Sequence, residues 1–125
     1  MPTKDFIIVG NVSYDPFTLD IGHLCGQQED VADIISLKSF ANTEFCPRFL
    51  MNDEKQLKGV GKGLSGLTVI ICSTTQHQLQ SRNALAMRTC ITARAAKENG
   101  ADKIILVEPD LFFSAQDRGD RKSVV

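Results

Sequence analysis

The apolar stretch LTVIIC, residues 67–72, decides the fold class of this chain. Valine, isoleucine and threonine are enriched in β-strands, and a nearly unbroken apolar run is typical of a strand that is buried on both faces. Such strands occur in parallel sheets that helices cover on both sides. The stretch therefore predicts a buried strand of a parallel α/β sheet.

Similar runs stand near the two ends of the chain. Residues 6–9 and 104–107 are short and apolar, and each predicts a further buried strand. Asp15 followed by Pro16 predicts the start of a helix, with the carboxylate as N-cap, and this helix is expected to end near Gly26. A strand followed by a helix is the unit from which parallel sheets are built.

A second, longer helix is predicted at about residues 79–99. Gly100 supplies its end, and apolar residues recur within it at steps of three and four, namely Ala84, Met87, Ile91 and Ala95. Strands that alternate with helices predict an α/β fold with a three-layer arrangement, in which helices cover both faces of a parallel sheet. Ligands of such folds bind beyond the carboxyl ends of the strands.

The middle of the chain departs from this alternation. Residues 34–37 form a second apolar run, and residues 44–51 could form a third strand. Pro47 lacks a backbone donor, so that strand is predicted to be an edge strand or part of a projecting antiparallel hairpin. Residues 55–66 are rich in Gly and Lys and read as a linker.

Composition limits the function classes. A length of 125 residues suits one domain, and a net charge of −1 gives no electrostatic footprint for nucleic acid. No apolar stretch approaches the roughly 18 residues that span a bilayer, so no membrane association is expected. The cysteines are widely spaced and read as reduced thiols, which favours the cytoplasm: Cys25, Cys46, Cys72 and Cys90.

The segment FANTE, residues 40–44, is the first candidate binding motif. In extended backbone Phe40, Asn42 and Glu44 point the same way, which puts an aromatic ring, an amide and a carboxylate on one side. Together they could stack on a purine and form hydrogen bonds with it. The alternative is a half-buried strand with one core phenylalanine and two solvated polar groups.

The segment FSAQDRGD, residues 113–120, is the second candidate. Its carboxylates, Asp117 and Asp120, could handle Mg²⁺ or a ribose hydroxyl. A charged run after a strand is also typical of a solvated loop. His23 and His77 have no partners at ligand spacing, so no metal site is predicted there.

Taken in order, four segments of the chain resemble the ribose-phosphate pyrophosphokinase family. FANTE is similar to the family's F-S-[DN]-x-E segment, and FSAQDRGD is similar to its Y-A-R-Q-D loop. Between them, Ser65-Gly66 with residues 67–73 matches the family's R-G strand, and the long helix up to residues 100–102 follows. The similarity covers nearly the whole chain.

This resemblance implies a fold and an activity. Members of the family use Mg²⁺ and transfer the pyrophosphoryl group of ATP to ribose 5-phosphate, in a phosphoribosyltransferase-like fold of two tandem α/β domains. Residues 1–125 would be the N-terminal domain, the ATP-binding and assembly half of a homo-oligomer. The second domain, which binds ribose phosphate, would lie outside this chain, so the chain alone is expected to be inactive.

The resemblance also implies site residues. Phe40, Asn42 and Glu44 would contact the adenine of ATP that is bound in a neighbouring subunit. A second set would lie near the nucleotide of its own subunit, namely Gln116, Asp117 and Asp120. No catalytic residue and no metal ligand is assigned within the chain.

Two alternatives stay open. One alternative is that the chain is a non-catalytic regulatory or assembly relative of the family, because Ala115 and Ser65 stand where the family has arginine. An unrelated nucleotide-binding α/β module is the other alternative, because fold alone does not fix function.

Overall fold

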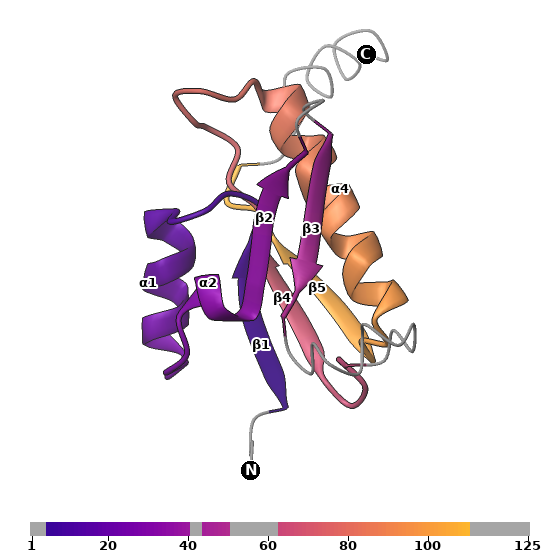
Figure 1. The fold of residues 1–125 in the computed structure, drawn as a ribbon. Coiled ribbons are helices and arrows are strands. Elements are labelled where there is room, and N and C mark those ends of the chain that lie inside the picture. Colours follow the sequence, from indigo (N-terminus) through magenta and orange to yellow (C-terminus); the bar gives the residue numbers. More distant parts are fainter. Residues whose placement is uncertain (1–4, 41–43, 51–62, 111–125) are drawn as a thin grey trace, which may run out of the picture.

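A three-stranded parallel sheet is the centre of the molecule (Figure 1). The computed structural model describes residues 5–40, 44–50 and 63–110. The strands lie in the order β1-β4-β5, where β1 is Phe6–Gly10, β4 is Thr68–Cys72 and β5 is Lys103–Val107. All three predicted strands are confirmed, and the chain is a mixed α/β protein.

Helices follow β1 and β4 in the chain. α1 (Pro16–Leu24) begins after Asp15, whose side chain accepts a hydrogen bond from the backbone N–H of Thr18. The predicted N-cap is therefore confirmed. α4 (Arg82–Glu98) begins later than expected, because Ser81 caps it by accepting from the N–H of Ala84.

α4 ends as the sequence predicts. Asn99 is its C-cap, and Gly100 follows with φ of 92°, in the left-handed region that glycine adopts at low cost. The backbone then turns directly into β5.

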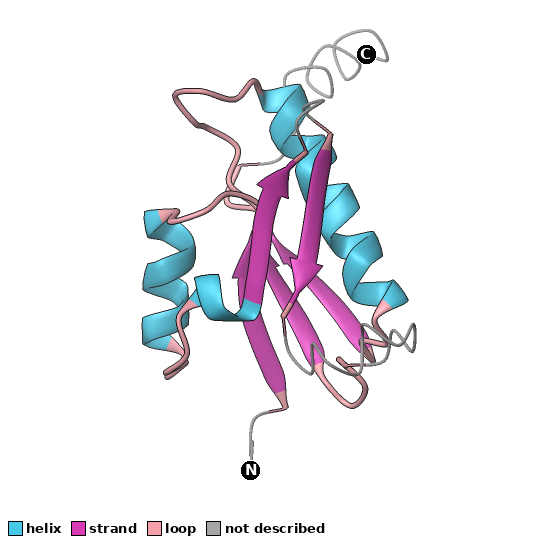
Figure 2. Cartoon of the chain, in the orientation of Figure 1, coloured by secondary structure: helices cyan, strands magenta, loops and turns pink. Residues whose placement is uncertain are grey.

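The middle of the chain forms a hairpin beside this sheet. A single helical turn, α2 (Val31–Ile34), leads into β2 (Ile35–Ser39), which pairs antiparallel with β3 (Phe45–Phe49). Pro47 lies opposite Leu37 in this two-stranded sheet, which confirms the predicted hairpin. Figure 2 shows the hairpin strands beside α4, and contacts join α4 to β3.

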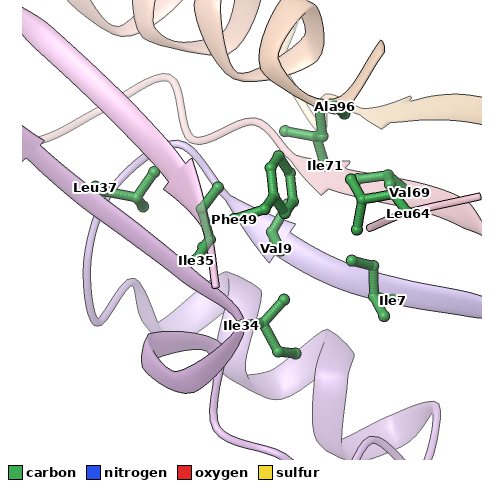
Figure 3. Packing of buried hydrophobic residues seen from close by; sticks show 10 residues of the cluster. All are labelled: Ile7, Val9, Ile34, Ile35, Leu37, Phe49, Leu64, Val69, Ile71 and Ala96. Carbon is green, nitrogen blue, oxygen red and sulfur yellow. The ribbon is translucent and has the colours of Figure 1, made fainter. Parts of the chain in front are cut away.

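The hydrophobic core joins the hairpin to the sheet. Phe49 of β3 is fully buried, and Figure 3 shows its ring among the side chains of Val9 and Ile71. Burying a side chain of this size stabilises the folded state by roughly 1.5–3 kcal/mol. The same cluster contains further residues from the sheet, the hairpin, α2, α4 and the segment before β4: Ile7, Ile34, Ile35, Leu37, Leu64, Val69 and Ala96.

Among the residues that the structure describes, no helix combines the length and the apolar composition that are needed to cross a bilayer.

Replacing Phe49 should uncouple the hairpin from the sheet. Phe49→Ala is expected to lower the free energy of unfolding by roughly 3–5 kcal/mol, because it removes a fully buried ring and leaves a cavity. Urea unfolding followed by circular dichroism measures this loss. Leu79→Ala is the matched control, because Leu79 is 87% exposed. A loss below about 1 kcal/mol at Phe49 would contradict the packing described here.

Candidate functional site

Three segments meet at the edge of the sheet where the parallel strands end. Asn11 follows β1, Ser73 and Thr74 follow β4, and Glu108 follows β5. In open parallel sheets this is the edge at which ligands bind. Many polar groups at this edge already form hydrogen bonds within the protein.

Asn11 is fully buried at this edge. Its Nδ2 lies within hydrogen-bond distance of the carbonyl oxygens of Thr74 (3.0 Å) and Leu85 (3.2 Å) and of Thr89 Oγ1 (3.0 Å). Its Oδ1 accepts from the N–H of Thr74 at 3.0 Å. The amide therefore ties together the ends of β1 and β4 and the side of α4.

Asp15 extends the same network toward α1. Its Oδ2 accepts from the backbone N–H of Thr18 (3.1 Å), from Thr18 Oγ1 (3.0 Å) and from Thr74 Oγ1. One carboxylate oxygen thus serves the start of α1 and the end of β4 at once. Asp15 and Asn11 together fix the relative positions of the segments that meet at this edge.

Arg88 of α4 connects this edge to the hairpin. Its Nε donates to the backbone carbonyl of Asn11 at 2.8 Å. Its guanidinium carbon lies 4.0 Å from the centre of the Phe45 ring, a cation–π contact with β3. Burial lowers the pKa of Arg88 from its ordinary value, but an arginine stays charged at neutral pH.

A hollow of about 580 Å³ lies between the hairpin and α4. The hairpin lines it with Ser39, Phe40, Glu44 and Phe45. The helix side contributes residues of α4 and one residue that precedes it, namely Gln80, Ala84, Met87, Arg88 and Ile91. The volume lies in the usual range for pockets that hold small molecules, and the lining has the usual mixture of apolar walls with a few polar groups.

The structure brings Phe40 and Glu44 together. Both line the hollow, and the backbone N–H of Phe40 donates to the carbonyl of Glu44 at 2.8 Å across the hairpin end. Asn42 lies outside the described residues, and so does the second predicted set: Gln116, Asp117 and Asp120.

Sequence reasoning missed Asn11 and Arg88, and it predicted Asp15 only as an N-cap. A polar residue directly after the strand that ends at Gly10 was the available signal for Asn11. Arg88 gave a weaker signal, as a charge inside an apolar helical pattern. The sequence position of each residue does not reveal which distant backbone carbonyl its side chain reaches.

The buried face of α4 also differs from the apolar stripe that predicted the helix. The fully buried residues are Leu85, Thr89, Thr92 and Ala96, whereas Ala84, Met87 and Ile91 line the hollow. Two of the four buried residues are threonines: Thr89 joins the polar network through Asn11 and Ser73, whereas the buried hydroxyl of Thr92 has no hydrogen-bond partner among the described residues. Three residues of the predicted stripe therefore face the hollow, whereas its fourth residue, Ala95, packs against the core.

Cys72 stands at the end of β4 beside these groups. Burial, and then the negative charge of Asp15, raise the pKa of its thiol to about 11, so the thiol is neutral at physiological pH. All four cysteines are free thiols. Within residues 5–40, 44–50 and 63–110 no group of three or more His, Cys, Asp or Glu side chains could hold a metal ion.

Comparisons of this chain with protein-family models, with curated proteins and with solved structures found no match.

Removing the Asn11 amide should destabilise the whole sheet edge. Asn11→Ala removes a fully buried amide and leaves the part-buried N–H of Thr74 without its acceptor, so a loss of roughly 2–4 kcal/mol in the free energy of unfolding is expected. Asn11→Asp, which keeps the shape but removes the donors, should be about as harmful. Asn83→Ala, at an exposed position of α4, is the control and should change stability by less than about 0.5 kcal/mol. Chemical denaturation at pH 7 tests all three variants. An Asn11→Asp variant as stable as the wild type would contradict the network.

The buried thiol of Cys72 predicts a loss of stability in alkali. Its pKa is about 11 in the folded chain against an ordinary 9.0, so the unfolded chain loses this proton first as the pH rises. The contribution of this pKa shift to the free energy of unfolding is at most about 3 kcal/mol. It is fully present below about pH 9 and is lost as the pH rises toward 11. Urea midpoints at pH 8 and pH 10.5 should fall further for the wild type than for Cys72→Ala. Equal falls in the two proteins would contradict the assignment.

Proposed function

We propose that this chain is the ATP-binding and assembly half of a ribose-phosphate pyrophosphokinase, which transfers pyrophosphate from ATP to ribose 5-phosphate. The observation that carries the proposal is that Phe40 and Glu44 line one hollow. The resemblance assigns these two residues to adenine, and the hollow offers a base-sized space beside both.

The chemistry of the two side chains suits a purine. The exposed ring of Phe40 offers a face for stacking, and such contacts are worth roughly 1–3 kcal/mol per base. The Glu44 carboxylate accepts hydrogen bonds, so it pairs with the exocyclic amino group of adenine. A stacked base with one directed polar contact is how many proteins hold nucleotides.

The finer parts of the proposal follow from the resemblance. They are a three-layer, phosphoribosyltransferase-like arrangement with helices on both faces of the sheet, Mg²⁺ bound with ATP, a cytoplasmic location and a homo-oligomer. The parallel order β1-β4-β5 and the separate hairpin support the fold part of this proposal. Pyrophosphoryl transfer depends mainly on positioning and charge neutralisation, which a second domain would supply.

The activity test uses the longest natural protein that contains these 125 residues. AMP formation from ATP and ribose 5-phosphate with Mg²⁺ is expected, and Phe40→Ala should raise the KM for ATP roughly tenfold because a base-stacking surface is lost. Leu79→Ala is the control for an exposed apolar residue outside the hollow. No AMP formation by a folded protein would favour the non-catalytic relative, and no ATP binding would contradict the proposal as a whole.

A further inference from the structure

α4 has an apolar face that the rest of the described chain leaves partly open. Its fully buried residues belong to the neighbouring face, and Met87 remains 60% exposed although it lies within the apolar stripe. Met87 lines the hollow together with Ala84 and Ile91. An unbranched thioether is polarizable and adapts to flat ligands, which makes it a suitable wall for a planar ring.

The other wall comes from the hairpin and also carries an exposed apolar group. Phe40 is 62% exposed at the end of β2, and it lines the same hollow. The hollow therefore has an aromatic ring on the hairpin side and a thioether on the helix side. Two apolar groups on separate elements can cover both faces of one heterocycle, which neither element could do alone.

Arg88 supplies a fixed positive charge within this hollow. Its Nε bond to Asn11 and its contact with the Phe45 ring hold the guanidinium in place from two sides. The terminal Nη1 and Nη2 groups have no hydrogen-bond partner among the described residues. An arginine fork with free terminal donors suits the oxygens of a phosphate, and its prior positioning reduces the entropy cost of binding.

We propose that the hollow between the hairpin and α4 is a complete nucleotide site within one chain, in which Phe40 and Met87 enclose an adenine-type base and Arg88 binds the phosphate. Glu44 receives the amino group of the base. This inference rests on the proposed function and deepens it, because it adds Met87 and Arg88 as specificity residues. It departs from the resemblance in one point, because it places the base in the chain's own hollow, whereas the resemblance places it in the ATP site of a neighbouring subunit.

The site needs both halves of its ligand. Inorganic phosphate lacks the ring that fills the space between the apolar walls. The Glu44 carboxylate, which lines the hollow with Arg88, would also repel it. Adenosine keeps the ring but has no group for the Arg88 fork. AMP should therefore bind more tightly than adenosine, and inorganic phosphate should bind weakest.

The test is a calorimetric titration of the 125-residue chain with AMP, adenosine and inorganic phosphate. Arg88→Met should weaken AMP binding roughly ten- to hundredfold and leave adenosine binding unchanged, because only AMP carries the phosphate. Met87→Ala should weaken both ligands by a similar factor. Arg94→Met is the matched charge control, since Arg94 lies on the exposed side of α4 and pairs with Glu98.

Folding is checked by circular dichroism, because Arg88 also bonds to Asn11. If Arg88→Met does not fold, Arg88→Lys keeps the charge without the fork and should still weaken AMP more than adenosine. The stoichiometry should be one AMP per chain at every protein concentration. Affinity that rises with self-association would overturn the single-chain site.

The two proposals fail in different ways. If Phe40→Ala weakens AMP binding but Met87→Ala and Arg88→Met do not, the single-chain site is wrong and the proposed function stands. If none of the three variants changes binding, both are wrong. Equal losses of AMP and adenosine in Arg88→Met would also overturn the role of Arg88 in phosphate binding.

Discussion

Asn11 holds together three elements that are far apart in the sequence. Its amide bonds to Thr74 after β4 through both its nitrogen and its oxygen, and it reaches Leu85 and Thr89 of α4. A fully buried amide must satisfy its donors and its acceptor, and unsatisfied groups of this kind are expensive. The position of α4 against the sheet edge is therefore fixed by hydrogen bonds as well as by apolar packing, and the other features depend on that position.

The hollow is one consequence. Because α4 turns Thr89 and its neighbours toward the polar network, its apolar stripe around Met87 faces the hairpin side instead. Arg88 lies between the two faces, so it can bond to the Asn11 carbonyl and still line the hollow. The Phe45 ring gives its guanidinium a second contact. A structural network and a candidate binding surface thus share one arginine.

This arrangement divides the chemistry between two places. At the sheet edge, Asn11, Asp15 and Thr74 are engaged with one another and with the backbone, so their contribution is to hold the scaffold rigid. In the hollow, Phe40 and Met87 remain well exposed and a charged fork stands beside them. Binding groups that are held by a rigid framework pay less entropy when a ligand arrives. That difference supports the proposal that a nucleotide binds in the hollow.

Local sequence patterns were enough to predict most of the helices and strands, although α2 was not among them. Short apolar runs predicted β1, β4 and β5, Asp15-Pro16 predicted the start of α1, and Pro47 predicted the hairpin, because these signals depend on residues that are close together in the chain. The sequence predicted Phe40 and Glu44 on one side of a single extended segment, whereas the two residues line the hollow from opposite arms of the hairpin. Only the tertiary structure decided which face of α4 is buried, where Arg88 reaches and which helix residues complete the hollow. Those outcomes depend on contacts between residues that are distant in the sequence, such as Arg88 with Asn11, which are 77 positions apart, and local periodicity carries no information about such contacts.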